Sequence, residues 1–111
     1  MADISTDLTL NYEEFIKSGD DDLSKKRFNS AITWYFKAIV VYCDLEIYKK
    51  QGLLPKNHTE RFLFMKMHFT KANSLVSKIF KKYTDTYNLR MSEKDVNYFK
   101  ENAKKIKELF I

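Results

Sequence analysis

The residue pair in this chain best suited to acid–base chemistry on a phosphate ester is Arg61 and His68, which are separated by six residues. If the segment is helical, a step of seven residues makes close to two turns, so both side chains project from one stripe. A guanidinium can hold a phosphate while an imidazole, which titrates near neutrality, moves a proton. Such cleavage needs no metal ion. The alternative is structural: an Arg and a His at the edge of a packed helix.

A second group of polar residues surrounds His58, which follows the only proline and begins a further predicted helix. The dipole at a helix N-terminus favours a neutral ring there, and the simplest role for His58 is to cap or brace the loop. The candidate binding residues are His58, Lys56, Asn57, Lys25, Lys26 and Arg27. The chain has no His-x3-His or His-Glu-x-x-His spacing, so we predict no metal site and no cofactor.

Charge is unevenly distributed along the 111 residues, whose formal net charge is +5. Residues 1–24 hold seven acids and one base, a net −6, whereas residues 25–111 hold the other 19 bases and 8 acids, a net +11. The basic remainder indicates an anionic partner, or ion pairing within the fold. A third interpretation is a solvated, Lys-rich surface without a partner.

The surroundings in which the chain works are indicated by its cysteine content and by its hydropathy. The single cysteine, Cys43, lies in an apolar stretch and has no partner for an internal disulfide, which favours a buried thiol and a reducing cytoplasm. No segment has the apolar length of a membrane span, and Met1 to Thr9 lacks the basic and apolar regions of a secretory signal. We therefore predict a cytoplasmic protein without membrane contact.

Apolar periodicity and a low content of Gly and Pro predict helices throughout. The first helix is expected to start between Asp7 and Asn11, and a long aromatic-rich helix with a wide apolar arc should cover residues 29–50. The residues predicted to start or end the helices are a capping pair Asn11/Glu14, a cap at Asn29 or Ser30, a C′ residue at Gly52, a cap at Asn57 with Glu60, and a cap at Ser92 with Asp95.

The stretch from residue 58 to residue 87 contains no Gly or Pro, so it could form one bent helix or two segments broken near Thr70 to Ser74. Short loops between successive helices favour an up-and-down arrangement. We predict a single all-α domain over residues 1–111, a four- to five-helix bundle with a flexible N-terminus at residues 1–7.

A Gly-x-x-Pro-x-x-His loop follows the long helix, which carries a Lys-Ala step. The residues concerned are Phe28, Ala31, Tyr35, Lys37, Ala38, Gly52, Pro55 and His58, and in the tail Tyr83, Tyr87, Ser92 and Asp95. Over about residues 10–108 this pattern resembles the HEPN superfamily, named for higher-eukaryote and prokaryote nucleotide-binding proteins.

The resemblance implies a HEPN-like bundle that often forms a homodimer, accompanies a small nucleotidyltransferase, or acts in toxin–antitoxin and defence systems. Many catalytic members are metal-independent ribonucleases with an Arg-x4-6-His motif, whose spacing Arg61 and His68 match, although Phe62 stands where those members usually have a polar residue. Other members lack the motif and have no established activity. We expect a non-enzymatic HEPN-like module that engages nucleotide or RNA. The alternatives are an endoribonuclease that uses Arg61 and His68, and a structural adaptor without a ligand.

Overall fold

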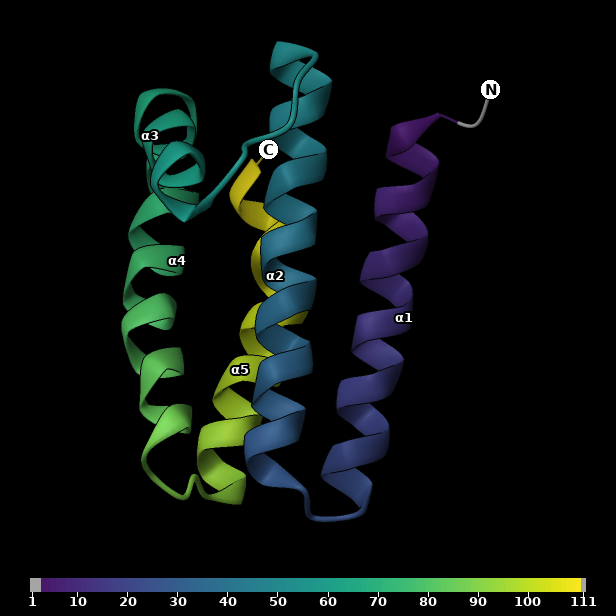
Figure 1. Cartoon of the computed structure of the whole chain (residues 1–111), viewed down its shortest axis with the longest axis vertical. Coiled ribbons are helices and arrows are strands. Elements are labelled where there is room, and N and C mark those ends of the chain that lie inside the picture. The colour runs from purple at the N-terminus through teal and green to yellow at the C-terminus, as the bar shows by residue number, and fades with distance from the viewer. Residues whose placement is uncertain (1–2, 111) are drawn as a thin grey trace.

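The computed structural model describes residues 3–110, in which five α-helices and two short 3-10 helices form a bundle (Figure 1). The elements are α1 (Ile4–Ser24), α2 (Phe28–Gln51), α3 (His58–His68), α4 (Thr70–Tyr83), η1 (Thr84–Tyr87), α5 (Glu93–Lys105) and η2 (Ile106–Phe110). In Figure 1, α1, α2, α4 and α5 run alternately down and up, with α2 in the middle. The prediction of an all-α bundle is confirmed. None of the helices described combines the length and hydropathy needed to cross a bilayer.

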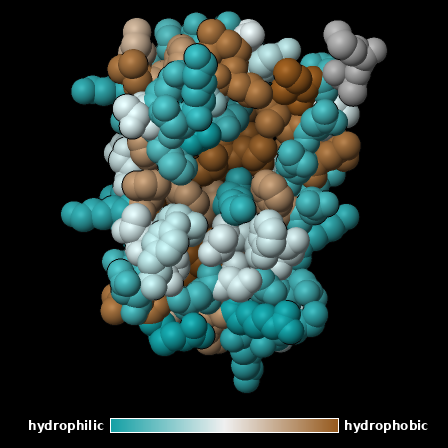
Figure 2. Space-filling view, in the orientation of Figure 1, coloured by the Kyte–Doolittle hydropathy of each residue, from teal (hydrophilic) through white to brown (hydrophobic). Residues whose placement is uncertain are grey.

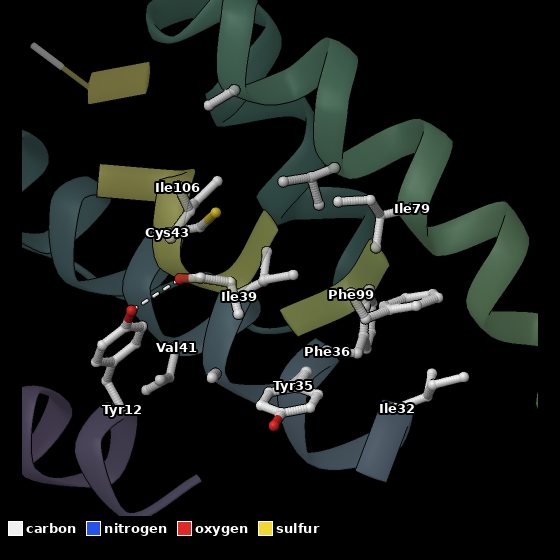
Figure 3. Packing of buried hydrophobic residues seen from close by; sticks show 14 of the residues in the cluster. Tyr12, Ile32, Tyr35, Phe36, Ile39, Val41, Cys43, Ile79, Phe99 and Ile106 are labelled. Atoms are coloured by element: carbon white, nitrogen blue, oxygen red, sulfur yellow. Dashed lines mark hydrogen bonds between the residues drawn. The ribbon is translucent and has the colours of Figure 1, made fainter. Parts of the chain in front are cut away.

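The helix α2 forms the centre of the hydrophobic core. Ten of its 24 residues are buried, on an arc that faces both α1 and α5, as the wide apolar pattern predicted. Figure 3 shows Ile32, Tyr35, Phe36 and Ile39 of this helix packed among residues of the other helices, including Phe99. Cys43 is also fully buried, and burial raises the pKa of its thiol. Its predicted role as a small apolar side chain is confirmed.

The helix α1 begins earlier than predicted. Asp3 caps it by accepting a hydrogen bond from the backbone N–H of Ser5 at 3.1 Å, and residues 4–7 form its first turn. The predicted start between Asp7 and Asn11, and the flexible segment that extended to residue 7, are therefore wrong; residues 1 and 2 lie outside the described residues. Asn11 and Glu14 have the spacing of a capping pair, but an Asp at position 3 satisfies the end of the helix first.

The cap predicted for α2 at Asn29 or Ser30 is also wrong, because both side chains bond elsewhere. The amide of Asn29 donates to the carbonyls of Thr86 (3.0 Å) and Leu89 (2.8 Å), and its oxygen accepts from the Met91 backbone N–H (3.0 Å). Ser30 donates to the carboxylate of Asp22. Asn29 thus joins α2 to a distant part of the chain, and Ser30 joins it to the end of α1.

The connection from α2 to α3 follows the sequence closely. Gly52 ends α2 in the left-handed conformation (φ 72°), as its predicted C′ role requires. The Asn57 side chain accepts a hydrogen bond from the Glu60 backbone N–H at 2.8 Å and caps α3. At the end of α3, Phe69 (φ −138°, ψ 68°) separates it from α4, which resolves the predicted choice in favour of two segments.

The helix α5 begins with the predicted capping box. The side chain of Ser92 accepts a hydrogen bond from the Asp95 backbone N–H, while the carboxylate of Asp95 accepts one from the Ser92 backbone N–H. The helix packs behind α2, and Tyr12 of α1 reaches it by donating to the Ala103 carbonyl at 2.8 Å (Figure 3). This packing leaves one face of α2, between α1 and α3, without a covering helix (Figure 1).

Candidate functional site

The uncovered face of α2 contains a cavity of about 510 Å³. Figure 2 shows this face of the molecule, where hydrophobic residues are exposed over α2 between α1 and α3 and hydrophilic residues surround them. The apolar part of the lining comprises Phe15, Phe36, Val40, Val41, Phe80, Tyr83 and Tyr87, and its charged and amide-bearing part comprises Lys37, Asp44, Asn57, His58 and Arg61. A largely apolar cavity of this size with a few convergent polar groups is typical of small-ligand sites.

A buried ion pair between α2 and α3 forms one end of the cavity. Arg61 donates from Nε to one oxygen of Asp44 at 2.6 Å and from Nη2 to the other at 3.0 Å. The two side chains are 10% and 15% exposed. Such a bidentate pair fixes the orientation of the guanidinium plane, and it leaves neither charge uncompensated in a poorly hydrated position.

His58 completes this polar cluster. The third guanidinium nitrogen of Arg61, Nη1, lies 2.8 Å from Nδ1 of His58. Because a guanidinium can only donate, Nδ1 accepts, and the neutral ring carries its proton on Nε2. Partial burial, and then the nearby Arg61 charge, hold the pKa of His58 below its ordinary value of 6.5, against a smaller opposite effect of Asp44. His58 is therefore neutral at pH 7 and offers Nε2–H as a hydrogen-bond donor.

Aromatic rings line the cavity on the α4 side. Tyr83 stacks on Phe36 with ring centroids 4.2 Å apart and an interplanar angle of 10°. Tyr87 meets Tyr83 edge-on at 5.8 Å and is 73% exposed. Burial, and then the bond to Tyr87, raise the pKa of Tyr83 to about 12, so it stays neutral at physiological pH. Phe36 is buried beneath Tyr83, so Tyr83 and Tyr87 are the rings of this group that offer flat surfaces for stacking a planar ligand.

Lys37 carries the charge at the other end of the lining. Its side chain is exposed, and its ammonium lies 5.3 Å from the centroid of the Trp34 ring. Within residues 3–110 it forms no ion pair. Since Asp44 neutralises Arg61 and His58 is uncharged, Lys37 supplies the net charge of the cavity lining.

His68 does not line this cavity with Arg61. Its Nε2 lies 3.2 Å from the amide nitrogen of Gln51, and it borders a separate pocket of about 360 Å³ together with Lys50 and Phe69. Side chains on a helix lean towards its N-terminus, so Arg61 reaches back to His58 rather than forward to His68. The two members of the predicted catalytic pair thus have different partners in this structure.

The other predicted binding residues are divided between two places. Asn57 lines the cavity beside His58, whereas Lys56 belongs to the preceding loop, where its backbone N–H donates to Glu60 at 3.3 Å. Lys25, Lys26 and Arg27 form the turn between α1 and α2, at the N-terminal end of α2 (Figure 1). There Lys25 pairs with Asp21 at 3.0 Å and Arg27 with Asp22 at 3.6 Å. Part of the acidic charge of α1 is therefore neutralised within the fold.

Asp44 is the residue that sequence reasoning missed. Its signal was an acid inside the apolar arc of α2, between Cys43 and Leu45. A carboxylate at such a position needs a partner, because burying an unpaired charge is costly. A search for that partner on the next helix would have led to Arg61. The residues described contain no group of three or more His, Cys, Asp or Glu side chains that could hold a metal ion.

Comparison with known proteins gave no match to a family model, a curated protein or a solved structure. The candidate site is therefore defined by its geometry, and the HEPN assignment stays a prediction that depends on the sequence motifs.

Proposed function

We propose that this chain is a HEPN-like binding module that takes a nucleotide, free or within RNA, into the cavity beside α2. The observation that carries the proposal is the combination in one cavity of aromatic surfaces (Tyr83, Tyr87), a neutral imidazole donor (His58) and a cation that forms no ion pair within residues 3–110 (Lys37). Nucleotides are recognised by such a combination of stacking, edge hydrogen bonds and charge on the phosphate. The loop that carries the family resemblance, Gly52 to His58, leads into the same cavity.

The proposal is tested by titrating the protein with the four nucleoside monophosphates and with a short single-stranded RNA, followed by amide NMR shifts and calorimetry. We expect shifts concentrated at residues around the cavity. Val40→Trp should abolish binding by filling the cavity, because Val40 is part of its lining. The matched control is Leu63→Trp, since Leu63 is 58% exposed on α3 and outside the lining. No binding by the native chain, or equal binding by both folded variants, would contradict the proposal and favour a ligand-free adaptor.

The resemblance also motivates a quaternary proposal: the chain forms a homodimer and acts with a nucleotidyltransferase, as in toxin–antitoxin-type systems. Analytical ultracentrifugation of the native chain at several concentrations measures the first part, and we expect a dimer. A monomer at high concentration that shows no change in size on adding nucleotides or RNA would count against it. A small nucleotidyltransferase encoded beside this chain would support the second part.

The ribonuclease alternative, with Arg61 and His68 as its catalytic residues, is tested separately by RNA cleavage. In the structure all three guanidinium nitrogens of Arg61 have partners within the chain, so we expect a binding module without His68-dependent cleavage. Metal-independent cleavage that His68→Ala removes would favour the enzyme. Cleavage that survives in His68→Ala would eliminate this residue assignment.

A further inference from the structure

The orientation of a ligand in the cavity follows from the charges of its lining. Asp44 and Arg61 neutralise each other, and the Arg61 side chain is nine-tenths buried behind that pair. His58 is neutral, because its Nδ1 accepts from Arg61. Lys37 is left as the uncompensated charge. An anionic group of the ligand is therefore attracted to the Lys37 end, and the Asp44 end offers it no cation that is free of a carboxylate.

The Asp44 end of the cavity offers one donor beside one acceptor. Among residues 3–110 the ring of His58 is hydrogen-bonded through Nδ1, and its Nε2–H has no partner. Each carboxylate oxygen of Asp44 accepts one bond from Arg61 and retains a lone pair for another donor. A nucleobase edge carries adjacent acceptor and donor groups in the same way. This end is therefore suited to the edge of a neutral planar base.

The two polar ends of the cavity lie at a fixed spacing along α2. Lys37 and Asp44 are seven residues apart on α2, which places them on the same face of the helix and about 10 Å apart along its axis. Val40 and Val41 lie between them in the lining, and the ring of Phe36 borders the same space. The cavity is thus polar at both ends and apolar between them, and only the Lys37 end carries a net charge.

From these observations we infer that the ligand is a single nucleoside monophosphate unit, bound with its base at His58 and Asp44 and its phosphate at Lys37. This inference rests on the proposed function and adds to it the orientation in which the nucleotide is bound. A phosphate monoester carries nearly two negative charges at neutral pH, so it is attracted to Lys37 more strongly than any uncharged part of the molecule. The base stacks against the aromatic lining, and the sugar lies beside the valines.

The phosphate end is tested with Lys37→Met, and with Lys50→Met as its matched control. Both lysines are exposed residues of α2 whose ammonium groups lie over a ring, Trp34 for Lys37 and Phe69 for Lys50, but Lys50 lies outside the cavity. The probes are the nucleoside monophosphates, the matching nucleosides and ribose 5-phosphate. We expect Lys37→Met to weaken monophosphate binding by about tenfold and to leave nucleoside binding unchanged. Lys50→Met should change neither.

The base end is tested with His58→Phe, which keeps a ring against Phe36 and Phe80 but removes the Nε2–H donor. It should weaken binding of nucleosides and monophosphates and leave ribose 5-phosphate unaffected. If nucleotides bind but Lys37→Met weakens nucleosides as much as monophosphates, or His58→Phe weakens ribose 5-phosphate most, the orientation is wrong and the proposed function survives. If none of these probes binds but single-stranded RNA does, the inference is wrong and the proposed function survives; if RNA does not bind either, both are wrong.

Discussion

On its α1 side, α2 is packed so closely that Tyr35 lies directly against Gly19, where an added Cβ would come within 2.6 Å of the ring. On its α3 side, the same helix is joined to its neighbour by the ion pair of Asp44 and Arg61, beside a cavity of about 510 Å³. The first contact leaves no space between the two helices, whereas the second leaves polar groups facing a cavity. The α1 flank of α2 is thus closed by side-chain packing, whereas the α3 flank combines a stabilising ion pair with the cavity of the proposed site.

The largest expected effect is on the α3 flank. Asp44→Ala leaves the buried Arg61 guanidinium without its carboxylate and should lower the free energy of unfolding by about 3–5 kcal/mol. Urea unfolding measures the loss, and hydrogen exchange should show faster opening of α3 than of α1. The control is Asp21→Ala, which removes an ion pair whose side chains are 51% and 58% exposed and should cost less than about 1 kcal/mol. Equal losses in the two variants would show that the Asp44–Arg61 pair stabilises the fold no more than an exposed ion pair does.

The next effect is on the α1 flank. Gly19→Ala introduces a methyl group within 2.6–2.8 Å of three ring atoms of Tyr35, a fully buried side chain that also donates to Asp20. Overpacking of this kind should cost about 1–3 kcal/mol, less the gain in helix propensity. We expect altered near-ultraviolet circular dichroism and faster exchange in α1, with the cavity residues unchanged. Ser18→Ala, one position earlier, should leave both measurements as they are.

A smaller effect is expected at the connection that leads into the open flank. Gly52 has φ +72°, and a Cβ there would meet no atom within 4 Å. The cost of Gly52→Ala is therefore one of backbone conformation alone, about 1 kcal/mol, measured by thermal or urea unfolding. Gly52→Asn should recover part of this loss, because Asn tolerates the left-handed region. If the cost were steric, Gly52→Asn would lower the free energy of unfolding more than Gly52→Ala does.

The smallest effect is a pH dependence confined to the open flank. The pKa of His58 is lowered in the folded chain, first by partial burial and then by Arg61, so the unfolded chain takes up its proton first as the pH falls through 6.5. In that window the unfolded state binds more protons, and the free energy of unfolding falls on acidification. Urea midpoints between about pH 7.5 and 5.5 should decrease more for the native chain than for His58→Phe. An equal decrease of the urea midpoint in the native chain and in His58→Phe would contradict a role of His58 in this pH dependence.

Features set by local chemistry could be predicted from the sequence. The Ser92–Asp95 capping box, the C′ role of Gly52 and the wide apolar arc of α2 each depend on residues within a few positions of one another. The predicted start of α1 was wrong because the sequence offers two capping signals, and the helix uses the one at Asp3, which lies nearer the chain end. Local rules rank such signals poorly when both are present.

The candidate site could be predicted only in part. His58 and Asn57 were identified and do line the cavity, since the loop motif fixes their place at the start of α3. The pairing of Arg61 with His68 followed from helical periodicity, which gives the stripe but not the separation along it: two turns are about 11 Å. Which residue Arg61 meets was decided by Asp44, 17 positions earlier on another helix. No local pattern contains that information.

The hydrogen bonds of Asn29 also have a kinetic consequence. They join the first turn of α2 to η1 and to the start of the segment before α5, positions 57 to 62 residues further along the chain. Helical turns form before contacts between such distant segments, so these bonds should be absent from the transition state for folding. Asn29→Ala is then expected to speed unfolding in stopped-flow experiments while the refolding rate stays nearly constant. One half-buried amide would thus lengthen the time for which the bundle stays folded, with little influence on how fast it forms.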